Sequence, residues 1–166
     1  MVSSNEEIDT EVQSRLSEYG LVLSPVMRDG NCFFHSVSMN ILSDLDQWNR
    51  SLTKIGVIDK LDIGLLSMKL RQAFVQEILG ERESYESFLI RELDYSTEAN
   101  KFLQDGFYVS SIGDLMPLAM ATVLQASVVI TTSSTSHPIY VTPLVGSIEG
   151  TVILVYNPNG WVIMMQ

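Results

Sequence analysis

The chain has 166 residues, of which 46% are hydrophobic and 18% are charged, a balance typical of one globular domain rather than of a disordered chain. Its formal net charge of −10, without any cluster of lysine and arginine, argues against binding to nucleic acid or to an anionic membrane surface. One cysteine excludes an internal disulfide, and one cysteine with two histidines cannot build a structural zinc centre.

The sequence of the N-terminal segment indicates a helix and does not have the pattern of a signal peptide. Residues 1–7 lack the positive and apolar regions of a signal peptide, and no apolar run in the chain is long enough to span a bilayer. We therefore expect an intracellular, cytoplasmic protein without a membrane partner. Apolar residues at helical spacing predict a helix over residues 6–19, which Gly20 ends.

Three further elements are predicted in the first half of the chain. Residues 21–26 read as a short strand, and a polar loop followed by a second helix occupies residues 27–48. A strong helix covers residues 65–79 and is closed by Gly80. The apolar stripes of these two helices are Val37, Ile41, Leu45 and Trp48 in the first, and Leu66, Leu70, Phe74 and Ile78 in the second.

The second half of the chain changes from helical to strand-rich character. Short helices are predicted around residues 85–89 and 97–103, and another opens at Gly113-Asp114 with Pro117 in its first turn. The C-terminal strands occupy residues 127–166, with β-rich runs at 127–132, 139–142 and 151–156. This order indicates a single α+β or three-layer domain.

The stretch Asp29-Gly30-Asn31-Cys32 is the only located candidate for chemistry. It places the sole cysteine directly after a tight polar turn and at the start of a helix. The helix dipole and unpaired backbone N–H groups at such a position stabilise the thiolate, the form that attacks carbonyl carbons. The alternative interpretation is a buried cysteine that acts as a small hydrophobic residue, preceded by an ordinary turn.

Other chemistries find little support in the sequence. It contains no Walker A loop, no Gly-x-Gly-x-x-Gly turn and no His-Glu-x-x-His motif, so we expect neither a nucleotide cofactor nor a metal. Paired-carboxylate hydrolysis stays open, but any pair chosen among 20 scattered acidic residues would be arbitrary.

The cysteine motif and three later blocks resemble the OTU (ovarian-tumour) family of cysteine proteases, which remove ubiquitin from proteins. Asp29-Gly30-Asn31-Cys32-Phe33-Phe34 is similar to the nucleophile motif of that family. The stretches 106–108 and 113–124, followed by a strand at 127–130, are similar to its second block. Tyr156-Asn157 resembles the stretch before its catalytic histidine, so the resemblance covers roughly residues 21–157.

The resemblance implies a papain-like OTU-type fold, with a small, mostly antiparallel sheet packed between helices. It implies that Cys32 is the nucleophile and that Asp29, with Gly30 and Asn31, belongs to the loop that forms the oxyanion hole. Backbone N–H groups of such a turn stabilise a developing oxyanion, and loss of one donor costs about 2.7–4 kcal/mol of barrier. The implied reaction is hydrolysis of isopeptide or peptide bonds at the C-terminus of ubiquitin through a Cys32 thioester, without a cofactor.

The sequence departs from the family pattern at the general base. The family places a histidine near the C-terminus, whereas the corresponding position here is Ile163, which cannot transfer a proton. The remaining candidates are weak, because His35 follows the cysteine by one helical turn and His137 lies in a Ser/Thr/Pro-rich connection. Two histories would explain the departure, a truncated or alternatively spliced product or a true inactivation.

Two functional hypotheses follow. The first is an OTU-type thiol hydrolase acting on ubiquitin or ubiquitinated proteins. The second is a catalytically inactive pseudoenzyme that binds ubiquitin or another protein.

Overall fold

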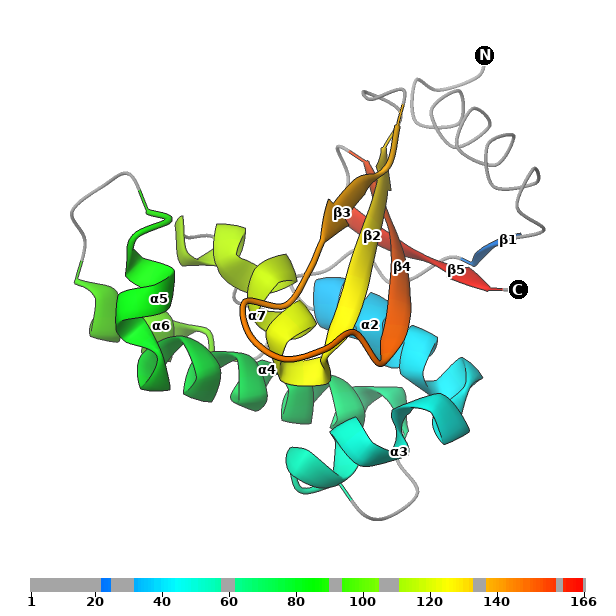
Figure 1. The fold of residues 1–166 in the computed structure, drawn as a ribbon, viewed down its shortest axis with the longest axis horizontal. Helices are drawn as coiled ribbons and strands as arrows, with labels where there is room; N and C mark the ends of the chain where they lie inside the picture. Colours follow the sequence, from blue (N-terminus) through cyan, green and yellow to red (C-terminus); the bar gives the residue numbers. More distant parts are fainter. Residues whose placement is uncertain are drawn as a thin grey trace.

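The structure is a computed structural model (Figure 1). It describes residues 22–24, 32–57, 62–89, 94–104, 111–132, 137–157 and 160–165. The predicted helix at residues 6–19 and the Asp29-Gly30-Asn31 turn lie outside this part of the chain. None of the helices in the described ranges combines the length and apolar character needed to cross a membrane.

The structure contains a five-stranded sheet with the strand order β1-β5-β4-β2-β3. Its strands are β1 (Val22–Ser24), β2 (Ala126–Thr132), β3 (Ile139–Val141), β4 (Gly150–Asn157) and β5 (Gly160–Met165). Three of the four strand pairings are antiparallel, and β2 with β4 is the parallel one. The predicted α+β class with a small, mostly antiparallel sheet is therefore confirmed.

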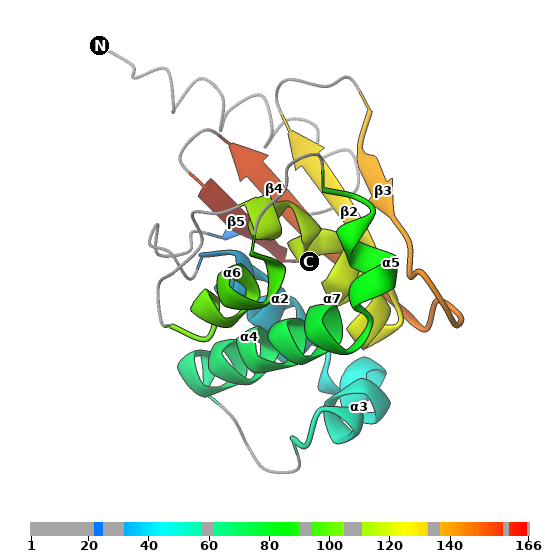
Figure 2. The same cartoon turned by 90° about the vertical axis from the view of Figure 1, so that its left-hand side faces the viewer.

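Six α-helices and one 3₁₀ helix lie in the other described residues. They are α2 (Cys32–Ser43), α3 (Leu45–Lys54), α4 (Ile63–Gly80), α5 (Arg82–Glu86), α6 (Tyr95–Lys101), the 3₁₀ helix η1 (Ser111–Leu115) and α7 (Met116–Leu124). Helices α2 and α7 pack on the sheet, and α4 packs on both of them from the other side. Figure 2 shows this order of layers, with α4 in front of α2 and α7 and the strands behind.

The prediction of a single helix that continues through Trp48 is wrong, because the helix is interrupted at Asp44. This residue has φ −151° and ψ 72°, outside the helical region, and α3 begins at the next residue. Leu45, which was predicted to lie on the apolar stripe, is 46% exposed, whereas Trp48 is buried. The break turns α3 so that Trp48 reaches the start of β4, where its ring lies against Gly150.

Helix α4 agrees with its predicted range and stripe. The Asp62 carboxylate accepts a hydrogen bond from the Leu65 N–H at 2.7 Å and so caps the first turn. All four residues of the predicted stripe are fully buried: Leu66, Leu70, Phe74 and Ile78. A helix of this length packs against both α2 and α7, and its stripe forms part of the core.

Helix α7 leads directly into the central strand β2. Pro117 lies in its first turn, where the missing N–H costs little, as predicted. The helix ends at Gln125, which has a left-handed backbone with φ 52°. This reversal allows β2 to begin at Ala126, one residue later.

Candidate active site

Helix α2 begins at Cys32, so the sole cysteine occupies the helix N-terminus that the sequence predicts. Asp29, Gly30 and Asn31 precede it and lie outside the described residues. Their place in an oxyanion loop stays a prediction. The backbone of the helix, however, provides the dipole that favours a thiolate at its first residue.

Side chains of α4 pack against the first turn of α2. Phe33 and Phe34 are buried, and the guanidinium carbon of Arg71 lies 4.6 Å from the centroid of the Phe34 ring. Arg71 is itself buried and donates a hydrogen bond from Nη1 to the Phe102 carbonyl oxygen at 3.0 Å. The Phe34 ring also contacts Phe74 with ring centroids 6.0 Å apart. These contacts fix the helix end that carries the cysteine.

A buried serine pair joins the next turn of α2 to α4. The Ser38 hydroxyl donates to the Phe34 carbonyl oxygen at 2.7 Å and lies 3.0 Å from the Ser67 hydroxyl. Both serines are buried, so neither hydroxyl has ready access to water. A hydrogen-bonded pair of this kind fixes the rotation of one helix against the other.

Asn40 attaches the C-terminal half of α2 to β4. Its side-chain amide donates to the Ile153 carbonyl oxygen and accepts from the Ile153 N–H, with both distances 3.0 Å. Ile153 lies one residue before the first β4–β5 pair, Leu154 with Ile163. The amide therefore continues the ladder of β4 at the point where β5 leaves it.

The structure places the strand of Ile163 against the helix of Cys32. Ile163 lies in β5, opposite Leu154 of β4 and Ser24 of β1. Helix α2 packs against β5 and β4. The elements that carry the predicted nucleophile and the predicted base position are thus in contact.

The two histidines occupy different places. His35 lies in the first turn of α2 and is half-buried. His137 is exposed and precedes β3, the edge strand at the far side of the sheet from β5. Three strand spacings of about 4.8 Å separate β3 from β5, or about 14 Å. Since α2 packs on β5 and β4, this position speaks against His137 as a base for Cys32.

Arg71 and Asn40 hold α2 in place through contacts that were not predicted from the sequence. Both lie within helical stretches, and their partners are 31 and 113 residues away. The one available signal was the presence of a charged and an amide residue among apolar neighbours. In the described part of the chain, no group of three or more His, Cys, Asp or Glu residues could hold a metal ion.

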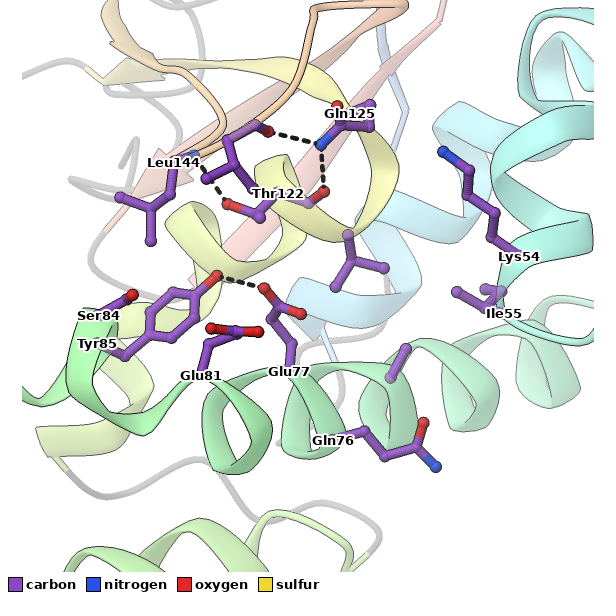
Figure 3. Close-up of a pocket in the computed structure, with 13 residues that line it drawn as sticks. Lys54, Ile55, Gln76, Glu77, Glu81, Ser84, Tyr85, Thr122, Gln125 and Leu144 are labelled. Atoms are coloured by element: carbon purple, nitrogen blue, oxygen red, sulfur yellow. Dashed lines mark hydrogen bonds between the residues drawn. The ribbon is translucent and has the colours of Figure 1, made fainter.

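A pocket of about 510 Å³, separate from the surroundings of Cys32, lies beside the C-terminal end of α7 (Figure 3). The end of α3, the last turns of α4, the start of α5, the end of α7 and the loop after β3 line it, and no residue of α2, β4 or β5 does. The Tyr85 hydroxyl donates to the Glu77 carboxylate at 3.0 Å. Burial raises the pKa of Tyr85 far above its usual value, and the charge of Glu77 adds to this effect. The phenol therefore stays protonated and acts as a donor.

The fold defined by this sheet and these helices is that of an OTU domain. The evidence comes from structure alone, since no protein-family model matches the chain and no curated protein matches it in sequence.

Two solved structures illustrate the similarity. The OTU domain of OTUD1 superposes with a TM-score of 0.68 at 16% identity, covering 95% of this chain and 94% of that one. A structure of h/ceOTUB1 with ubiquitin aldehyde and UBC13~Ub gives a TM-score of 0.54 at 14% identity, covering 86% of this chain and 76% of that one. The predicted OTU-type fold is confirmed by these matches.

Proposed function

We propose that this domain is an OTU-type thiol hydrolase that acts on isopeptide or peptide bonds at the C-terminus of ubiquitin, with Cys32 as the nucleophile. The observation that carries the proposal is the position of Cys32 as the first residue of α2, packed on β5 and β4 in an OTU fold. The OTUB1 structure contains ubiquitin aldehyde and UBC13~Ub, which supports ubiquitin as the partner class.

The reaction has two steps. In the first, the Cys32 sulfur bonds to the carbonyl carbon of the terminal ubiquitin residue, the C–N bond breaks, and the amine leaves with a proton. In the second, water attacks the thioester carbonyl, releases the ubiquitin carboxylate and returns the thiol. The helix dipole lowers the energy of the thiolate, and backbone N–H groups before Cys32 would stabilise the oxyanion.

The general base is the part of the mechanism that this chain lacks at the expected place. An imidazole that takes the thiol proton and returns it to the leaving amine contributes about 10²–10⁴-fold to such a rate. With Ile163 at that position, we expect turnover well below that of an enzyme with a complete pair.

The direct test uses ubiquitin with a C-terminal fluorophore and di-ubiquitin as substrates. We expect slow, saturable hydrolysis by the wild-type chain and none by Cys32→Ala. We expect Ile163→His to increase kcat while leaving KM nearly unchanged. Folded wild-type protein with no hydrolysis, together with a folded Ile163→His variant that gains none, would overturn the proposal.

A second candidate function is binding of ubiquitin without turnover, and Ile163 is the observation that favours it. Calorimetric titration of the Cys32→Ala variant with ubiquitin tests this function separately from catalysis. Saturable binding with no hydrolysis by the wild-type chain would assign the domain to this class. Absence of heat at millimolar ubiquitin would exclude it.

A further inference from the structure

The pocket beside α7 contains two acidic side chains that form no ion pair with the described residues. Glu77 and Glu81 lie four residues apart at the end of α4, and Figure 3 shows their carboxylates side by side next to the Tyr85 ring. Two like charges at this spacing destabilise a helix. Among the described residues neither carboxylate forms an ion pair, and Lys54, which lines the same pocket, pairs with neither. The pocket therefore offers two carboxylates to a cation from outside.

The walls of the pocket indicate what kind of cation fits. Ile55, Val123 and Leu144 supply apolar surface to the walls of the pocket. The cluster of chelating side chains that a metal ion needs is absent from the described residues. A long aliphatic stem that ends in a delocalised cation matches apolar walls with a carboxylate pair at one end. An arginine side chain has this chemistry, and its five donors can reach two carboxylates at once.

The rim of the pocket is an exposed apolar loop that is fixed in place. Val145 is 69% exposed and Leu144 is 37% exposed. Their backbone is nevertheless held by α7: the Thr122 hydroxyl accepts from the Leu144 N–H at 3.1 Å, and the Gln125 side-chain amide donates to the Val145 carbonyl oxygen at 2.9 Å. The Glu149 N–H also donates to the Gln125 carbonyl oxygen at 2.6 Å. Because these hydrogen bonds already hold the loop, little of its conformational entropy would be lost when a partner binds.

Gly146 shows how closely this loop is fitted to α7. Its φ is +89°, and a Cβ added there would lie 1.7 Å from Oε1 of Gln125. Only glycine permits both the backbone conformation and the close approach of the amide. The exposed side chains of the loop are thus presented by a backbone built around Gln125.

We propose that this pocket and its rim bind an extended segment of a partner protein in which one arginine is flanked by apolar residues. The arginine enters the pocket and pairs with Glu77 and Glu81, and the apolar neighbours lie on Leu144 and Val145. The volume of about 510 Å³ falls within the range of about 300–1,000 Å³ found for sites that enclose small ligands. The net charge of −10 favours approach of such a basic segment. The site is independent of Cys32 and of the proposed hydrolase activity.

The test is an NMR titration of the ¹⁵N-labelled full chain with the peptide acetyl-Ala-Val-Arg-Val-Ala-amide. The matched control peptide carries citrulline, which has nearly the shape of arginine without its charge. We expect saturable shifts of the Glu81, Gln125 and Val145 amides and an affinity at least tenfold higher for the arginine peptide. Equal affinity for both peptides, shifts confined to other elements, or no saturable shift at 5 mM peptide would overturn the proposal.

Variants separate the two parts of the site. Glu77→Gln combined with Glu81→Gln should weaken binding at least tenfold while keeping an acceptor for the Tyr85 hydroxyl. The matched control, Asp46→Asn with Glu83→Gln, removes two charges outside the pocket and should change affinity less than twofold.

The rim is tested without any change of charge. Val145→Ser should weaken binding about threefold, the effect of losing about 0.65 kcal/mol of apolar contact at an exposed side chain. Unchanged binding by either the double glutamine variant or Val145→Ser would contradict the arrangement, whatever the state of the hydrolase reaction.

Discussion

Replacing Asn40 tests how the nucleophile helix is attached to the sheet. In Asn40→Ala, the Ile153 N–H and carbonyl oxygen both lose their partners, because β4 has no strand pair on that side at this residue. An orphaned backbone group costs about 1–3 kcal/mol, and partial access of water at this half-buried place favours the lower end. We expect a loss of about 2–3 kcal/mol in the free energy of unfolding, and a fall in Tm of about 4–12 °C for a chain of this length.

Urea unfolding followed by circular dichroism measures the loss, and native-state hydrogen exchange locates it. The Ile153 amide should exchange much faster in Asn40→Ala, while amides in the centre of α4 should follow only the change in global stability. Asn40→Asp keeps an acceptor for the Ile153 N–H but loses the donor to its carbonyl oxygen. This variant should therefore protect the Ile153 amide yet remain less stable than the wild type.

The control is Asn49→Ala, a change of the same kind at an exposed position of α3 whose side chain forms no hydrogen bond with the described residues. A surface change of this kind lies within about 0.5 kcal/mol of the wild type. If Asn40→Ala is as mild as Asn49→Ala, or if the Ile153 amide keeps its protection, the assignment of Asn40 as the link between α2 and β4 is refuted.

Three further predictions concern packing and titration. Gly150→Ala should destabilise the chain by about 1–3 kcal/mol in urea unfolding, since a Cβ there would lie 2.9 Å from the Trp48 ring, whereas Gly80→Ala meets no neighbour and should stabilise it by about 0.5 kcal/mol. Trp48→Ala should cost about 3–5 kcal/mol by the same measurement, and a cost under 1 kcal/mol would show that this ring is not a core contact. Burial raises the pKa of Tyr95 to about 12, so the unfolded state releases this proton first as the pH rises above about 10, and stability should fall between about pH 10 and 12 by about 1.4 kcal/mol per pH unit. Burial also raises the pKa of Tyr85, which adds to this fall, so Tyr95→Phe should make the slope between pH 10 and 12 shallower without abolishing it, and an unchanged slope would rule out a contribution from Tyr95.

The elements that could be predicted from the sequence are those specified by local periodicity. The stripe of α4 repeats every four residues from Leu66 to Ile78, and the predicted end at Gly80 agrees with the structure. Pro117 in the first turn of α7 was a local signal of the same kind, whereas the left-handed Gln125 that ends the helix was not predicted. The β-rich runs at 127–132, 139–142 and 151–156 also form strands, because short runs rich in β-branched residues favour strands through their local sequence alone.

What the sequence could not provide depends on contacts between distant residues. The helical spacing of apolar residues continues through Asp44, so the sequence gives no sign that the helix ends there. The observed end of the helix accompanies a contact between Trp48 and Gly150, which are 102 residues apart in the sequence. The parallel pairing of β2 with β4 is likewise invisible in either strand alone. The link from Asn40 to β4 could not be predicted either, because the sequence around an asparagine within a helix does not indicate which distant residue it will bind.

The contacts that hold α2 against the sheet and α4 involve Phe34, Ser38, Asn40 and Arg71, and none of these residues needs to exchange a proton with a substrate. These contacts do not involve position 163. Isoleucine has a higher strand propensity than histidine, so Ile163→His should cost about 1 kcal/mol or less of stability while adding an imidazole. A gain in turnover by a less stable protein would tie the change to proton transfer rather than to folding. A folded variant that gains nothing, with the Ile153 amide still protected, would instead place the deficit in residues 25–31, which precede Cys32.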